Sequence, residues 1–137
     1  TQPYEMASRN IKDSHPILQE QFLKAQAEFQ KDHPNARVIL TCTYRSPEEQ
    51  NTLYAQGRTT KGPKVTNARG GQSAHNFNPS FAIDVAFIVE GVVNWQSQWF
   101  KIFSKYMANP KIEWGGTWKF LDLPHYEVKG WKQLTGK

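Results

Sequence analysis

The spacing of apolar residues predicts a helix near the N-terminus. Pro16 suits the first turn of a helix, and His33-Pro34-Asn35 interrupts the pattern that follows it. Between these points the apolar residues recur at helical spacing: Ile17, Leu18, Phe22, Ala25 and Phe29. We therefore expect an amphipathic helix with one face packed on a core.

Short apolar runs further along the chain predict β-strands. Residues 37–43 and 81–89 are rich in β-branched or apolar side chains, as buried strands are. Glu90-Gly91 predicts a turn into a short partner strand at residues 92–93. Two more short strands are expected at residues 111–114 and 125–128, with a Gly-Gly turn between them.

Two further helices are expected from their start and stop residues. Ser46-Pro47 followed by Glu49 is typical of a helix start, and Gly57 ends that helix after about Ala55. Asn94 is the expected cap of the other helix, which Asn109-Pro110 terminates. Its apolar side would carry Trp95, Trp99, Ile102, Phe103 and Tyr106.

The order of these elements does not alternate regularly between strand and helix. It predicts an α+β fold with helices packed against a small antiparallel sheet. No repeat or low-complexity tract divides the chain, so residues 1–137 are expected to form one domain. Residues 1–12 are polar, and a loosely ordered N-terminal arm is expected there.

Composition narrows the class of protein. Hydrophobic residues make up only 38% of the chain, but five Trp and eight Phe supply large core side chains, which indicates a folded domain. No apolar run approaches the roughly 18 residues of a membrane span, and no secretory signal is visible, although the chain begins with Thr. A net charge of +5 favours an anionic partner without identifying it. Cys42 lies in an apolar run, where a small buried side chain is the main interpretation and a nucleophilic thiol the lesser one.

Four polar residues stand out as candidates for metal chemistry. His75 ends a long irregular loop that begins at residue 58, and loops of this length are often functional. Asp84 is the one acid in an apolar strand, where an unpaired carboxylate is costly. His125 begins a strand, three residues after Asp122. Two histidines and an aspartate with a second carboxylate fit the ligands and the general base of a zinc peptidase.

Each of these residues also has a plain structural interpretation. Asp84 fits a sheet aspartate that accepts hydrogen bonds from a neighbouring loop, and Asp122 fits a turn former before Pro124. Residue spacing alone leaves both interpretations open.

Four segments of the chain resemble the signature motifs of the M15 peptidases. This family contains D-alanyl-D-alanine carboxypeptidases and L-alanyl-D-glutamate endopeptidases of bacteria and phages. The motifs extend in the family's order from about residue 38 to 128, through residues 43–59, 65–75, 82–84 and 114–127. The resemblance implies an α+β domain with a zinc site at the sheet.

The resemblance also implies a role for each matched residue. His75, Asp84 and His125 would bind zinc, and Asp122 would act as the general base. Arg45 would stabilise the oxyanion that forms at the scissile carbonyl, although a salt bridge to Glu48 or Glu49 is the alternative. Ser73 and Gln50 match polar positions near the substrate.

This chain departs from the family pattern in two places. Eight residues, 76–83, separate His75 from Asp84 where the family usually has six. Asn78-Pro79 resemble the tip of a two-residue insertion, which we expect to bulge outward from the metal site. Thr117 occupies a position where family members often carry Asp.

The leading hypothesis is therefore a zinc-dependent endopeptidase that cuts the L-alanyl-D-glutamate bond of peptidoglycan, in the manner of a phage endolysin. A D-alanyl-D-alanine carboxypeptidase is the closest alternative. A noncatalytic module that binds cell wall or nucleic acid is a more distant one. We expect a monomer with no nucleic-acid partner. It would be either phage-encoded, made in the host cytoplasm and acting on the wall after release, or an exported bacterial wall enzyme.

Overall fold

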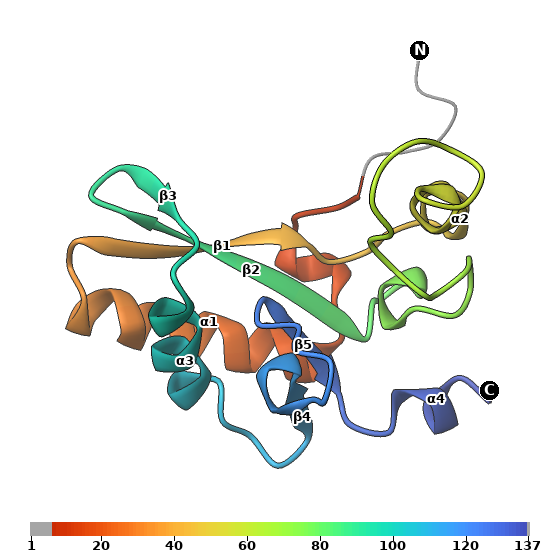
Figure 1. The fold of residues 1–137 in the computed structure, drawn as a ribbon. Helices are drawn as coiled ribbons and strands as arrows, with labels where there is room; N and C mark the ends of the chain where they lie inside the picture. The colour runs from red at the N-terminus through yellow and green to blue at the C-terminus, as the bar shows by residue number, and fades with distance from the viewer. Residues whose placement is uncertain (1–6, 137) are drawn as a thin grey trace.

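An antiparallel sheet of five strands organises residues 7–136, which the computed structural model describes (Figure 1). The strand order is β1-β2-β5-β4, and β3 pairs with β2 outside this path. This arrangement confirms the predicted α+β class and all five strand positions to within two residues. The strands are β1 (Ala36–Cys42), β2 (Ala82–Val89), β3 (Val92–Asn94), β4 (Ile112–Trp114) and β5 (His125–Val128).

The two longest helices cover one side of the sheet. α1 (Pro16–Asp32) and α3 (Ser97–Tyr106) contact each other there, and α1 also contacts β1 (Figure 1). α2 (Pro47–Ala55) and the loop after it lie at the opposite end of β2 from the β2–β3 turn. The shorter helices are η1 (Ile11–Asp13), η2 (Ala74–Asn76), η3 (Gly115–Thr117) and α4 (Trp131–Leu134). Among residues 7–136, no helix has the length and apolar character needed to cross a membrane.

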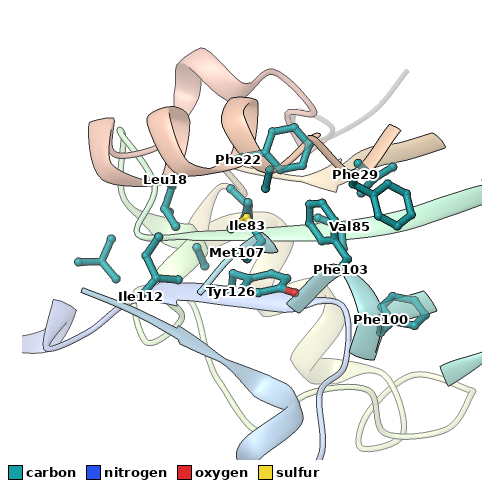
Figure 2. Packing of buried hydrophobic residues seen from close by; sticks show 14 of the residues in the cluster. Leu18, Phe22, Phe29, Ile83, Val85, Phe100, Phe103, Met107, Ile112 and Tyr126 are labelled. Atoms are coloured by element: carbon teal, nitrogen blue, oxygen red, sulfur yellow. The ribbon is translucent and has the colours of Figure 1, made fainter. Parts of the chain in front are cut away.

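Aromatic side chains build the core between α1, α3 and the sheet (Figure 2). Leu18, Phe22, Ala25 and Phe29 are buried on α1, as their spacing predicted. The ring of Phe29 lies 5.6 Å from that of Phe87 on β2 and 5.4 Å from that of Phe103 on α3, centroid to centroid. Edge-to-face and tilted pairs of this kind add to the free energy of burial. This core fixes β2 in place, and β2 carries Asp84.

The start of α2 follows the predicted capping pattern. Ser46 Oγ accepts a hydrogen bond from the Glu49 amide at 3.1 Å, and Pro47 occupies the first turn. Gly57 follows the helix with φ of 82°, a left-handed conformation that favours glycine. The helix thereby ends where the sequence predicted.

The start predicted for α3 was wrong. Asn94 is the last residue of β3, and its Oδ1 accepts a hydrogen bond from the Gln96 amide at 2.9 Å. This local turn delays the helix to Ser97, so Trp95 precedes it and is 62% exposed. Trp95 instead stacks on Phe100, with ring centroids 6.2 Å apart.

Part of the predicted N-terminal arm is tied to the sheet. Residues 1–6 lie outside the described residues, but Ser8 pairs with the chain just after β1. Its amide donates to the Tyr44 carbonyl at 2.8 Å, and its carbonyl accepts from the Thr43 amide at 2.7 Å. Residues from Ser8 onward therefore support the segment that carries Thr43, which contacts His75.

The segment before β2 is exposed at Asn78 and Pro79, in agreement with the predicted outward bulge, and the residues on either side anchor it. Ser80 is fully buried, and its backbone bonds to Asp13 and His15 at 2.8 Å each. Phe77 and Phe81 lie beside Trp131 of α4, with centroid distances of 5.8 and 6.4 Å. Aromatic side chains on both sides of Asn78-Pro79 therefore fasten the two ends of the bulge to the domain.

Replacing Phe29 with Ala is expected to lower the free energy of unfolding by about 3–5 kcal/mol, because it leaves a cavity among packed rings. Urea denaturation measures the change. Leu23→Ala is the matched control, since Leu23 lies on the same helix and is 50% exposed. Its effect should stay within about 0.5 kcal/mol. Equal losses for the two variants would show that the core is not where the structure places it.

Candidate metal centre

The register of the sheet places three side chains in a row at Asp84. Asp84 on β2 lies opposite Cys42 on β1 and opposite His125 on β5. The β1–β2 register shifts between Leu40 and Cys42, a bulge-type irregularity. Bulges of this kind commonly re-aim side chains near functional sites. Directly opposed residues point to the same face of a sheet, so this face carries the candidate site.

His75 reaches Asp84 from η2, at the end of the long loop. Ser73 Oγ accepts from the His75 amide at 3.2 Å, and the His75 carbonyl accepts from the Arg45 amide at 2.9 Å. The ring Nδ1 lies 2.7 Å from the Thr43 carbonyl oxygen, which can only accept. In the neutral ring the proton therefore sits on Nδ1, and the Nε2 lone pair is free. Nε2 is buried 3.3 Å from Asp84 Oδ2, without a well-aligned hydrogen bond.

His125 approaches the other oxygen of Asp84. Its Nδ1 lies 3.0 Å from Asp84 Oδ1, and its Nε2 donates to Glu127 Oε1 at 2.8 Å. Trp131 Nε1 donates to Glu127 Oε2 at 3.1 Å and so orients that carboxylate. If a metal ion displaced the proton from Nδ1, the bond to Glu127 would keep the remaining proton on Nε2 and leave the Nδ1 lone pair facing Asp84.

Sequence reasoning missed Glu127 and Trp131 as parts of this site. The available signal was the two-residue spacing of His125 and Glu127 on one strand, which puts both side chains on the same face. The contact of Trp131 with Glu127 depends on the path of α4 and has no comparable local signal.

The electrostatics of the three residues are strongly coupled. Burial alone would lower the pKa of His75, but the Asp84 carboxylate outweighs it and raises that pKa to about 10. Burial opposes protonation of His125 as well, while hydrogen bonds to Asp84 and Glu127 raise its pKa to about 9. Burial would raise the pKa of Asp84, but His75 and His125 hold it well below its usual range. With no metal bound, both rings are therefore cationic at neutral pH.

Asp122 lies beside this cluster with its carboxylate half exposed. Its Oδ2 is 4.0 Å from His125 Nδ1. Its amide donates to the Gly115 carbonyl at 3.0 Å, and a β-carbon on Gly115 would overlap the carbonyl oxygen of Asp122. Glycine at 115 thus permits the close approach that positions this carboxylate. Partial burial raises the pKa of Asp122, and nearby Asp84 adds to this against the opposing effect of His125.

Arg45 and Ser73 line the same cleft as His75, Asp84 and His125. The volume of this cleft is about 390 Å³. Among residues 7–136, no ion pair joins Arg45 to Glu48 or Glu49. Arg45 Nη1 instead donates to Gln50 Oε1 at 3.0 Å. Gln50 is buried outside the cleft lining, and its Nε2 donates to the Ala68 carbonyl at 2.9 Å. The position of Gln50 supports a role in orienting Arg45, and not the direct contact with a substrate that was predicted.

Cys42 is buried, as predicted, yet it lies beside the site. Its Sγ is 3.5 Å from His75 Nδ1. Donor atoms of Cys42, His75 and Asp84 lie within 4.8 Å of one another, a grouping that can hold a metal ion. Two donor sets therefore share His75 and Asp84, and they differ in whether Cys42 or His125 is the third member.

Known proteins resemble this chain in sequence and in fold. The family described as D-alanyl-D-alanine carboxypeptidase, in the M15 peptidases, matches residues 66–128. The peptidoglycan L-alanyl-D-glutamate endopeptidase CwlK of Bacillus subtilis (strain 168) is 39% identical over 130 residues, covering 85% of this chain and 74% of that protein. This chain belongs to the M15 peptidase family. The crystal structure of the L-Ala D-Glu endopeptidase ChiX of Serratia marcescens has the same fold, with a TM-score of 0.67 at 20% identity over 96% of this chain and 93% of that one.

The chelated, metal-free protein is expected to lose stability as pH rises from about 6.5 to about 10. The raised pKa values of His75 and His125 contribute free energy that is fully present below pH 6.5 and is lost as pH passes through about 9 and 10. Urea denaturation at successive pH values measures the slope. Asp84→Asn removes the carboxylate and should flatten it. A slope that is the same in both proteins would contradict this account of the cluster.

Proposed function

We propose that this chain is a zinc-dependent peptidase that hydrolyses the L-alanyl-D-glutamate bond in the stem peptide of bacterial peptidoglycan. The observation that carries the proposal is the convergence of His75 and His125 on the two oxygens of Asp84, with Asp122 beside them in one cleft. Two imidazoles and a carboxylate are a common ligand set of catalytic zinc, and a separate carboxylate is the base such sites need.

The hydrogen bonds of the two rings support His75, Asp84 and His125 as the ligands. The buried Nε2 of His75 points its lone pair toward Asp84, and Glu127 frees the Nδ1 of His125 in the same direction. The thiol of Cys42 lies on the Nδ1 side of His75, where the Thr43 carbonyl already holds the proton. Cys42 is therefore disfavoured as a third ligand through the same nitrogen.

The other residues of the cleft fit the steps of amide hydrolysis. When bound, zinc supplies Lewis-acid chemistry that activates water and polarises a carbonyl near neutral pH. Asp122, whose pKa is raised, would accept a proton from the attacking water and deliver it to the leaving amine. Arg45, oriented by Gln50, would stabilise the negative charge that develops on the carbonyl oxygen. Ser73 stays a predicted substrate contact at the edge of the cleft.

The names of similar proteins favour an endopeptidase over a carboxypeptidase, since CwlK and ChiX are both L-alanyl-D-glutamate endopeptidases. The metal cleft shares Val65, Thr66 and Asp122 with a larger groove next to it, so it continues past the general base. This continuity leaves room for a substrate that extends beyond the scissile bond, as an endopeptidase requires.

Digestion of purified peptidoglycan tests the proposal. The zinc-loaded protein is expected to release peptides with a new D-glutamate N-terminus, as read by mass spectrometry. Chelation should abolish the release, and Asp122→Asn should reduce it by about 10²–10⁴-fold, the usual contribution of general acid–base catalysis. Free D-alanine as the product would establish a carboxypeptidase, and the absence of any zinc-dependent product would refute both activities.

Glu127→Gln is expected to weaken zinc binding by about 10–100-fold, because the carboxylate sets the ring orientation and basicity of His125. Competition with a chromogenic chelator measures the affinity without reference to activity. Glu20→Gln makes the same charge change on the exposed face of α1 and should leave the affinity unchanged. Equal affinities for the wild-type and Glu127→Gln proteins would remove Glu127 from the support of the metal centre.

A further inference from the structure

A second and larger groove opens beside the metal cleft. It has a volume of about 1150 Å³, against about 390 Å³ for the metal cleft. The two cavities share Val65, Thr66 and Asp122 as lining residues, so a molecule whose reacting bond lies at Asp122 can extend directly into the groove. The proposed metal ligands His75, Asp84 and His125 line the smaller cavity alone.

One wall of the groove is aromatic and apolar. Trp118, Phe120, Leu121 and Trp131 form this wall. Phe120 is 83% exposed and Leu121 is 67% exposed, and Val65, which also lines the groove, is 55% exposed. Single exposed apolar residues are ordinary, but a cluster of them around a concavity marks a binding surface. The Trp118 ring lies 5.3 Å from that of His125, so the wall reaches the metal centre itself.

The groove lining between residues 65 and 72 offers hydrogen-bond donors. Asn67 Oδ1 accepts from Arg58 Nη2 at 3.1 Å, and Gln72 Oε1 accepts from the Arg69 amide at 2.8 Å. These bonds fix both carboxamides through their oxygens. Within the described part of the chain, neither side-chain NH₂ group donates a hydrogen bond, so each remains available to a ligand.

We infer that this groove binds the N-acetylmuramic acid sugar that carries the stem peptide. The inference rests on the proposed function, because that sugar is joined to the L-alanine whose far bond would be cut. A sugar ring has an apolar C–H face for the aromatic wall, and it has hydroxyl and acetamido oxygens for the NH₂ groups of Asn67 and Gln72. Its attachment point, one residue from the scissile bond, matches the continuity of the two cavities.

Charge argues against the other part of the substrate as the occupant. The peptide from D-glutamate onward carries free carboxylates, which favour cationic partners. Lys132 is the one basic residue among those that line the groove, and its Nζ lies 5.9 Å from the centroid of the Trp131 ring. Arg45 lies in the metal cleft. The groove therefore complements a neutral sugar better than an acidic peptide.

Two substrates that differ only in the sugar test the inference. One is the free stem peptide, and the other is the same peptide with N-acetylmuramic acid on its L-alanine. Phe120→Ala should lower kcat/KM for the muramoyl peptide by about threefold to tenfold, the usual range for loss of one aromatic contact. It should leave kcat/KM for the free peptide unchanged. Leu134→Ala removes another exposed apolar residue, outside the groove lining, and should change neither value.

Equal losses on both substrates would assign the groove to the peptide, and no loss on either would show that Phe120 touches no substrate; both results overturn the inference. Binding of N-acetylmuramoyl-L-alanine, followed by NMR line broadening, provides an arm that needs no catalysis. Wild-type protein should bind this probe more tightly than Phe120→Ala does, and equal binding would overturn the inference. Failure of the wild-type protein to cut either peptide would instead refute the proposed function. Binding of N-acetylmuramoyl-L-alanine would still test whether the groove binds the sugar.

Discussion

The carboxylate of Asp84 lies inside an otherwise apolar central strand, and much of the surrounding structure serves to accommodate it. Burial of an unpaired carboxylate is costly, so the strand is tenable only where opposite charge or a metal ion reaches both oxygens. His75 arrives from a loop and His125 from the neighbouring strand, one to each oxygen. The core of α1, α3 and β2 fixes the position of the strand, and the strand register fixes the position of His125.

A second layer of contacts determines which nitrogen of each ring faces Asp84. The Thr43 carbonyl sets the orientation of His75, and the segment of Thr43 is itself paired with Ser8. Glu127 sets the orientation of His125, and Trp131 holds Glu127 while packing against Phe77 and Phe81. The residues that flank the Asn78-Pro79 insertion thereby support His125, a proposed metal ligand, through aromatic contacts. Such support reduces the reorganisation needed when a metal binds.

Local patterns in the sequence predicted what local physics controls. The spacing from Leu18 to Phe29 gave α1, and the Ser46-Pro47 start gave α2, because periodicity and capping act within a few residues. The isolated charge of Asp84 and the motifs shared with the M15 peptidases pointed to the site. Long-range packing could not be predicted from the sequence, because it depends on segments that are distant in sequence. Examples are the register shift at Cys42, the burial of Ser80 and the hydrogen bond from Trp131 to Glu127. Trp95 was wrongly predicted to lie on α3, because a side-chain hydrogen bond of Asn94 shifts the start of that helix to Ser97.

X-ray absorption spectroscopy of the zinc-loaded protein tests most directly the claim that His75, Asp84 and His125 form the metal centre. Two imidazole nitrogens and carboxylate oxygen should give a first coordination shell at about 2.0–2.2 Å with no sulfur. The spectrum should also contain the multiple-scattering pattern of two imidazole rings. His125→Ala should reduce that pattern to one ring. A sulfur shell at about 2.3 Å, the usual Zn–S distance, would instead show that Cys42 is a ligand and would contradict the account.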